Sequence, residues 1–273
     1  LSEKNRIVLI GDSFIEGVLL DYESTVAGLL DNHFSKNNIE VLNASVSSYS
    51  PIIYYNKIKY YLEKGLKFSH LVVFIDISDI EDETIYYEYD ETNKIVLGTK
   101  LLQQEDSDSK NNLRTKIITF LQTRLSITYT LFKYFDDNLI DSLQLPSEKE
   151  FIDSIVSKNF TRDKWTIDIE LREKYQEGID KSINNMTLLK NILDKNNIKL
   201  SIVVYPWFSQ IYHNDLNSEH VKIWENFSKK NNIQFLNLFP TFINDEDKNI
   251  NIYNKIQKDF ISYDVHWNKS GSK

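Results

Sequence analysis

The sequence predicts an α/β protein: a three-layer α/β/α sandwich with a five-stranded parallel sheet and a largely helical insertion. Short β-branched runs alternate with segments of helical spacing near both ends of the chain, which predicts βαβ units with right-handed crossovers. Between residues 80 and 165 this alternation stops. A chain of 273 residues accommodates one large domain that carries such an insertion.

Three strands and two helices are predicted before residue 80. Residues 6–11 (RIVLIG) indicate a buried strand, because the run is short, β-branched and ended by Gly. Residues 24–36 have apolar side chains at three- and four-residue steps, which predicts a helix with Ser24 as its N-cap. The remaining elements are a strand at 39–45, a helix at 51–65 and a strand at 70–76.

The second half of the sheet is predicted after a long helix at 168–195, whose apolar residues recur on one face. It comprises a strand at 199–207, a helix at 218–231 and a strand at 233–239. Residues 1–79 and 166–273 are therefore interpreted as one α/β domain. Residues 80–165 are interpreted as an inserted cap, with helices near 113–135 and 147–158 and no strand of the same kind.

Composition excludes several classes of function. The net charge is −8 and no basic stripe is present, which argues against nucleic-acid binding. The absence of Cys removes disulfides and thiolate chemistry, and no metal or other cofactor is predicted. The chain begins at Leu1 and not at Met, so we expect an upstream signal or membrane anchor beyond it. A periplasmic, extracellular or membrane-associated location is the expectation, with a cytoplasmic one left open.

Polar side chains follow the predicted strands at the edge where open parallel sheets bind their ligands. Two further candidates, Asp264 and His266, lie near the C-terminus. The full set is Asp12, Ser13, Asn43, Ser48, Asp76, Ser78, Trp207, Asp264 and His266. A serine, a base, a carboxylate that orients the base and donors for an oxyanion are what a hydroxyl nucleophile requires.

Four segments in this order resemble the SGNH (GDSL-like) hydrolase superfamily, in its bacterial carbohydrate esterase and O-acyltransferase branch. They are GDSF (11–14), NASVSSYS (43–50), DISD (76–79) and DVHWN (264–268). The resemblance implies a flavodoxin-like sheet, with Ser13 as nucleophile, His266 as base and Asp264 as its orienting carboxylate. It covers about two thirds of the chain and excludes the insertion.

The chain departs from that family pattern at three positions. Ser48 stands where the family uses Gly as a backbone oxyanion donor, and Ser78 stands where it uses Asn. The usual Asp-x-x-His is Asp264-Val265-His266, a spacing known in alginate acetyltransferase relatives.

Three further residues have open roles. Asn43 is either a pocket donor or a turn former. Asp12 is interpreted as structural, bonding loop N–H groups beneath the site. Trp207 either stacks on sugar rings or belongs to the core, and the same two alternatives apply to the group Tyr86, Tyr87 and Tyr89.

The predicted function is ester hydrolysis or acyl transfer on O-acyl groups, O-acetyl foremost, of a carbohydrate or surface glycan through an acyl-serine. The partner is then a small-molecule or glycan ester. One alternative is a lipid esterase or thioesterase, which requires an apolar acyl channel. Another is a degenerate, non-catalytic glycan-binding or assembly protein, which requires that Ser13 and His266 do not approach each other.

An acidic cluster and four further histidines lie outside this pattern. Asp76, Asp79, Glu81, Asp82 and Glu83 are interpreted as a solvated acidic loop, with a calcium site as the alternative. The other four histidines lack metal-ligand spacing and are interpreted as structural or surface residues. They are His33, His70, His213 and His220.

Overall fold

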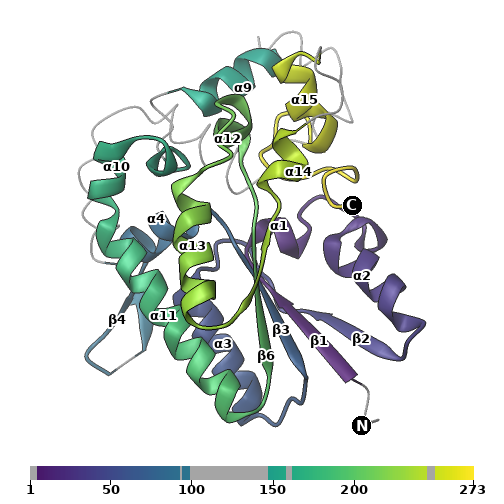
Figure 1. Cartoon of the computed structure of the whole chain (residues 1–273), viewed down its shortest axis with the longest axis vertical. Helices are drawn as coiled ribbons and strands as arrows, with labels where there is room; N and C mark the ends of the chain where they lie inside the picture. The colour runs from purple at the N-terminus through teal and green to yellow at the C-terminus, as the bar shows by residue number, and fades with distance from the viewer. Residues whose placement is uncertain (1–4, 93, 99–146, 158–161, 245–249) are drawn as a thin grey trace.

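A computed structural model describes residues 5–92, 94–98, 147–157, 162–244 and 250–273. Its centre is a five-stranded sheet in the order β2-β1-β3-β6-β7, with every neighbouring pair parallel (Figure 1). The strands are β1 (Asn5–Ile10), β2 (Ile39–Asn43), β3 (His70–Ile75), β6 (Lys199–Val204) and β7 (Gln234–Asn237). The predicted α/β fold with a five-stranded parallel sheet is confirmed.

Helices flank the sheet as right-handed crossovers require. The chain reverses its direction across the sheet after β2, so the helix before β2 and those after it lie on opposite faces. The first is α2 (Val26–Ser35), which packs on β2. The others are α3 (Pro51–Glu63), α11 (Gln176–Lys195) and α13 (Glu219–Lys230), and α11 packs along α3.

Shorter elements surround the carboxyl ends of the strands. They are α1 (Ser13–Glu16), α4 (Asp79–Glu81), a π-helical turn (Asp82–Tyr86), α9 (Glu148–Val156), α10 (Ile169–Lys174), α12 (Phe208–Tyr212), α14 (Phe239–Ile243) and α15 (Ile252–Asp259), with 3₁₀ turns at Tyr22–Ser24 and Lys164–Thr166. In Figure 1, α9, α12, α14 and α15 gather at one end of the sheet. Among the described residues, no helix is long and apolar enough to cross a bilayer.

The segment predicted as an insertion is partly described. The helix expected near 147–158 is α9, and the helix expected near 113–135 lies outside the described residues. A feature that the sequence did not predict is a short antiparallel hairpin of β4 (Tyr87–Tyr89) and β5 (Ile95–Leu97). Trp165, at the end of this segment, is fully buried and donates from Nε1 to the Ile77 carbonyl at 2.8 Å. The described ends of the segment therefore pack into the core.

Two helix boundaries differ from the prediction. The N-cap of α2 is Thr25 and not Ser24, because the Thr25 hydroxyl accepts a hydrogen bond from the Gly28 N–H at 3.1 Å. The long helix at 168–195 is interrupted at Tyr175, which ends α10 and precedes α11. Tyr175 is buried, and its hydroxyl lies 3.1 Å from a Glu81 carboxylate oxygen, so a contact with α4 accompanies the break.

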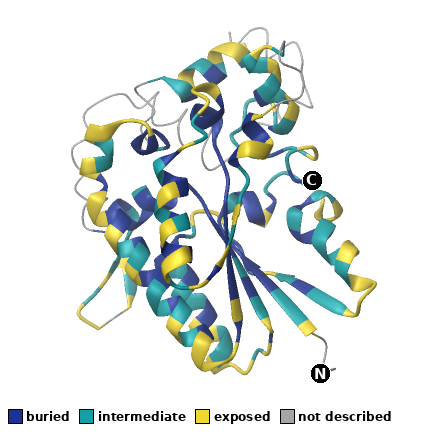
Figure 2. Ribbon diagram, in the orientation of Figure 1, coloured by how far each residue is buried: buried dark blue, intermediate teal, exposed yellow. Residues whose placement is uncertain are grey.

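Burial increases toward the carboxyl ends of the three central strands, β1, β3 and β6 (Figure 2). In β1 the last three residues are buried and the first is exposed, and in β6 all but the first residue are buried. The edge that parallel sheets use for ligands is therefore covered by other elements, and polar groups there need partners within the protein.

The interpretation of the acidic cluster as a solvated loop is wrong. Asp76, Asp79 and Glu83 are 0% exposed and Asp82 is 1% exposed. Each has donors that offset the loss of water: Trp207 for Asp76, Tyr54 for Asp79, Arg162 for Asp82 and Asn185 for Glu83. In the described part of the chain, no group of three or more acidic, His or Cys side chains is arranged to hold a metal ion, so the calcium alternative finds no support.

Candidate active site

Ser13 occupies the first position of α1, directly after β1 and a two-residue turn. The turn is tight: a Cβ on Gly11 would lie 2.9 Å from the Ile15 side chain and 3.0 Å from the Phe74 carbonyl. Asp12 caps α1 by accepting the Phe14 N–H at 3.0 Å. The turn thus brings the Ser13 hydroxyl to the end of the sheet.

The C-terminal segment brings a histidine and a carboxylate to that hydroxyl. His266 Nε2 lies 2.8 Å from Ser13 Oγ, and His266 Nδ1 is hydrogen-bonded to Asp264 Oδ1. The side chains of His266 and Asp264 are 18% and 14% exposed, so the pair is largely shielded from solvent. The three side chains form the nucleophile, base and orienting-carboxylate arrangement that serine-based acyl transfer requires.

The two-residue spacing of Asp264 and His266 is explained by a local turn. Asp264 Oδ1 accepts the backbone N–H of His266 at 2.9 Å as well as the ring Nδ1. A backbone hydrogen bond from Ile261 N–H to the His266 carbonyl, 2.9 Å, fixes the segment from the other side. The Phe14 ring, with its centroid 5.0 Å from that of His266, packs against the imidazole.

The contact between Asp264 and His266 shifts the pKa values of the two groups in opposite directions. Burial disfavours charge on both groups, but the mutual hydrogen bond and charge attraction outweigh it. The pKa of Asp264 is therefore lowered, and the pKa of His266 is raised, with Asp12 and Asp76 adding to the rise. Asp264 is suited to remain ionised while His266 exchanges a proton.

Asp12 lies beneath the nucleophile and is 3% exposed. One carboxylate oxygen accepts the Tyr205 hydroxyl at 3.0 Å together with the Phe14 N–H, and the other lies 3.3 Å from Ser13 Oγ. Burial raises the pKa of Asp12 to about 7, and the charge of Asp76 adds to this rise. These contacts match the interpretation of Asp12 as a residue that supports the loop.

Ser48 lies in a turn beside α1 and has a left-handed backbone, with φ of 62°. This conformation is one that Gly adopts without strain, which agrees with the position of Ser48 at a glycine of the family pattern. Glu16 accepts the Ser47 N–H at 2.7 Å, and Asn43 Nδ2 donates to the Ile15 carbonyl at 2.7 Å, so the turn is tied to α1. Among the described residues, neither the Ser13 N–H nor the Ser48 N–H has an acceptor.

The three other predicted site residues are engaged within the protein. Asn43 Oδ1 accepts the Ser45 N–H at 3.0 Å, so its amide ties the turn to α1 as a turn former would, while the pocket-donor role stays a prediction. Ser78 is 2% exposed and its N–H donates to Asp76 at 2.7 Å, while the role of its hydroxyl stays a prediction. Trp207 is 5% exposed and donates to Asp76 at 2.7 Å, so the sugar-stacking interpretation is wrong and the core interpretation holds.

Three contacts made at the site were not predicted. Tyr205 bonds Asp12, Glu16 bonds the turn of Ser48, and the Tyr87 hydroxyl donates to the Ser48 carbonyl at 2.8 Å. Tyr87 was predicted only as one of the aromatic residues that could stack on sugar rings. All three contacts join distant parts of the chain, which spacing does not reveal.

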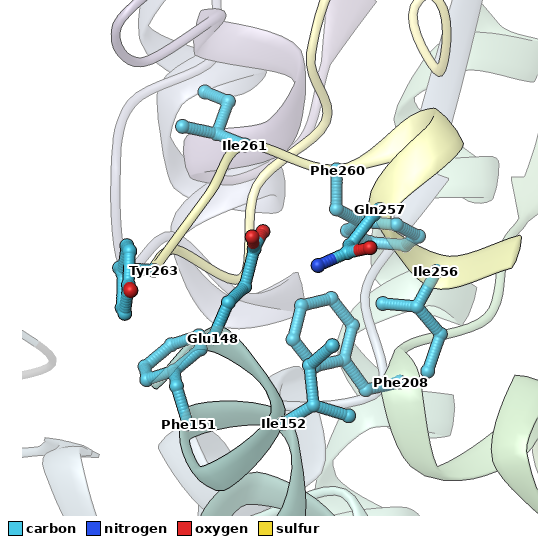
Figure 3. Close-up of a pocket in the computed structure, with 9 residues that line it drawn as sticks. All are labelled: Glu148, Phe151, Ile152, Phe208, Ile256, Gln257, Phe260, Ile261 and Tyr263. Carbon is cyan, nitrogen blue, oxygen red and sulfur yellow. The ribbon is translucent and has the colours of Figure 1, made fainter. Parts of the chain in front are cut away.

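An apolar hollow lies beside the segment that carries Asp264 and His266 (Figure 3). Its volume of about 170 Å³ includes space open to solvent. Pockets for drug-sized ligands occupy roughly 300–1,000 Å³. Within the described residues, this hollow is not the long acyl channel that a lipid esterase needs. Its lining comes from α9, α12, α15 and the segment after α15: Glu148, Phe151, Ile152, Phe208, Ile256, Gln257, Phe260, Ile261 and Tyr263.

No protein-family model and no curated protein sequence matches this chain. Several solved structures are similar in fold. Esterase EstA from Pseudoalteromonas sp. is 13% identical, with 98% of this chain and 91% of that one covered and a TM-score of 0.43. A member of the lipolytic protein G-D-S-L family from Veillonella parvula is 12% identical, with 98% and 92% covered and a TM-score of 0.45.

An acetyl xylan esterase, AlAXEase, is 13% identical, with 98% of this chain and 93% of that one covered and a TM-score of 0.46. At these identities and TM-scores, the activities of such neighbours are not carried over to this chain.

Proposed function

We propose that this protein is a serine-dependent esterase or O-acyltransferase that acts through an acyl-serine intermediate. The observation that carries the proposal is the continuous contact from Ser13 Oγ to His266 Nε2, at 2.8 Å, and from His266 Nδ1 to Asp264. A degenerate binding protein has no need to keep this contact, so the geometry argues against that alternative.

The reaction follows from the proton positions that the contacts allow. Ser13 Oγ attacks the ester carbonyl and its proton passes to His266 Nε2, while Asp264 stabilises the imidazolium. The carbon–oxygen bond to the leaving alcohol then breaks, and that oxygen takes the proton from His266. Water or a second hydroxyl group, deprotonated by His266, then attacks the acyl carbon; the bond to Ser13 Oγ breaks, and Ser13 Oγ recovers its proton from His266. The free N–H groups of Ser13 and Ser48 are the proposed donors to the oxyanion.

For the substrate we propose a short acyl group, acetyl foremost, on a carbohydrate. The short acyl group is proposed from the resemblance of the four sequence segments to esterases and O-acyltransferases. The carbohydrate part rests on the resemblance of the four sequence segments. Whether water or a sugar hydroxyl resolves the acyl-serine separates an esterase from a transferase.

The test is hydrolysis of p-nitrophenyl acetate and p-nitrophenyl decanoate, with acetylated xylan as a carbohydrate ester. Ser13→Ala and His266→Ala should abolish activity on the acetate, and decanoate should be the poorer substrate. Ser35→Ala and His33→Ala, both exposed on α2, are matched controls and should retain activity. Products formed with an added sugar acceptor distinguish transfer from hydrolysis.

Covalent labelling provides a second measurement. A fluorophosphonate should label wild-type protein at Ser13 and leave Ser13→Ala unlabelled, because only an activated serine reacts rapidly with it. Folded wild-type protein with neither ester hydrolysis, acyl transfer nor labelling would overturn the proposal.

A further inference from the structure

The peptide group that carries the Ser48 N–H is anchored on both sides. On one side, Glu16 accepts the Ser47 N–H at 2.7 Å and also bonds the Ser47 hydroxyl. On the other side, the Ser48 carbonyl accepts the Tyr87 hydroxyl at 2.8 Å. The Tyr49 N–H closes the turn on the Val46 carbonyl at 3.1 Å. The direction of the Ser48 N–H is thus set by its neighbours.

The two anchors come from different parts of the fold. Glu16 is the last residue of α1, three positions after Ser13, so it couples the turn to the nucleophile. Tyr87 is the first residue of β4, in the hairpin that follows β3 and that the sequence did not predict. Burial raises the pKa of Tyr87 to about 12, so its hydroxyl keeps its proton and stays a donor at neutral pH.

Ser48 needs such support because a residue other than Gly pays a conformational penalty at positive φ. Ser48 is also exposed, so the core does not hold its backbone. A hydrogen bond to its carbonyl restricts ψ at this residue and counteracts relaxation toward an ordinary turn.

We propose that Tyr87 is a positioning residue: its hydroxyl holds the Ser48 carbonyl so that the adjacent Ser48 N–H stays directed at the oxyanion formed on Ser13. Through Tyr87, the hairpin of β4 and β5 thereby orients one donor of the proposed oxyanion pocket. The catalytic part of this inference rests on the proposed function, whereas the restraint on the turn does not.

The test compares Tyr87→Phe with Tyr89→Phe. Both residues lie on β4 and both substitutions remove one hydrogen-bonded hydroxyl, but the Tyr89 hydroxyl meets Asn56 of α3, at 2.7 Å, and not Ser48. Tyr87→Phe should lower kcat on p-nitrophenyl acetate about 3- to 10-fold, the effect of one net hydrogen bond, with KM within about 2-fold. Tyr89→Phe should leave both constants near wild type.

Two further readouts separate positioning from general damage. The inhibition constant of a trifluoromethyl ketone, which forms a tetrahedral adduct on serine, should rise in Tyr87→Phe by the factor that kcat/KM falls. Amide hydrogen exchange of residues 44–50 should increase in Tyr87→Phe and not in Tyr89→Phe.

The outcomes are distinguishable. Equal exchange and equal kinetics in the two variants overturn the inference. Increased exchange with unchanged kcat also overturns it, because the turn would then be restrained without catalytic effect. If the wild type itself is inert toward esters and fluorophosphonate, the proposed function fails, and the exchange comparison alone decides whether Tyr87 restrains the turn.

Discussion

His266 Nε2 lies 2.8 Å from Ser13 Oγ, although the two residues are 253 positions apart in the chain. The fold produces this contact in two steps. The turn after β1 places Ser13 at the carboxyl edge of the sheet, and the segment after α15 places His266 over the same edge. Hydrogen bonds at Ile261 and Asp264 fix the His266 backbone there.

Asp264→Asn should lower kcat on p-nitrophenyl acetate by about 10²–10⁴, because Asn does not stabilise the imidazolium and favours the wrong tautomer of His266. The folded state should be largely retained, since Asn can still accept the His266 N–H. Steady-state kinetics and circular dichroism check this. Asp194→Asn, at an exposed carboxylate on α11, is the control. A variant within twofold of wild type would contradict a role for Asp264.

The pH profile of kcat/KM should rise on its acid side with a midpoint above 6.5, the ordinary value for His. His266 must be neutral to accept the Ser13 proton, and Asp264, Asp12 and Asp76 raise the pKa of His266 despite its burial. A fit of kcat/KM between pH 5 and 9 gives this midpoint. A midpoint at or below 6.5 would show that burial outweighs the carboxylates.

Asp12→Asn should move that acid limb to lower pH, because it removes a carboxylate that favours the charged form of His266. Asp194→Asn should leave the limb unchanged. The shift is measured on the same kcat/KM profile, and its absence would mean that Asp12 does not act on His266.

The same variant has a predicted effect on stability. The folded pKa of Asp12, about 7, lies above its ordinary value of 3.8, so the folded state holds an extra proton between these pH values. The protonated Asp12 carboxyl therefore adds to the free energy of unfolding at low pH, and this stabilisation is lost as the pH rises to 7. From pH 5 to pH 8, the stability of wild type relative to Asp12→Asn should fall by on the order of 1–4 kcal/mol. Urea unfolding at both pH values measures this.

The strands and the three reacting residues could be predicted from local signals. Short apolar runs, β-branched in β1, β2, β3 and β6, marked the strands of the sheet, and the residue types after β1 and near the C-terminus indicated Ser13, Asp264 and His266. For Trp207, local signals did not determine the direction of the side chain. A residue that follows a strand can point outward or into the core, and here a buried carboxylate, Asp76, draws the indole inward.

The acidic segment after β3 shows a second limit. Charge density alone suggested contact with solvent, but the segment passes under neighbouring elements that provide donors, among them Arg162 for Asp82. The Tyr87 contact was equally inaccessible, because it joins a hairpin to a turn 39 residues away. Such pairings arise from tertiary packing, which leaves no periodic pattern in the sequence.

Ser48→Gly should stabilise the protein relative to Ser48→Ala by about 1 kcal/mol. Both lose the hydroxyl, but only Ala keeps the Cβ that opposes the left-handed backbone, with φ of 62°. Since the proposed oxyanion donor is the backbone N–H, kcat of Ser48→Gly should stay within about 3-fold of wild type. Thermal unfolding and ester kinetics on both variants check this. A stability order with Ala above Gly would contradict the turn geometry.

Glu83→Ala should destabilise the protein by about 2–4 kcal/mol. Glu83 is fully buried, and its two oxygens accept the Ser50 hydroxyl at 3.1 Å, the Ile52 N–H and the Asn185 side chain at 3.0 Å. One carboxylate thus joins the start of α3 to α11. Its removal leaves these donors unpaired in a cavity.

Glu83→Gln separates the loss of acceptors from the loss of volume. Gln keeps the size and one oxygen, so we expect a smaller cost, about 1–2 kcal/mol. Burial raises the pKa of Glu83 to about 7, so the carboxyl group is neutral in the folded protein at pH 5 and becomes charged by pH 8. The buried charge lowers the free energy of unfolding of the wild type at the higher pH. The deficit of Glu83→Gln should therefore shrink as the pH rises from 5 to 8. Urea unfolding tests the order, with the exposed Glu91→Ala as a control. Equal stabilities of Glu83→Ala and Glu91→Ala would mean that α3 and α11 are held by their apolar packing alone.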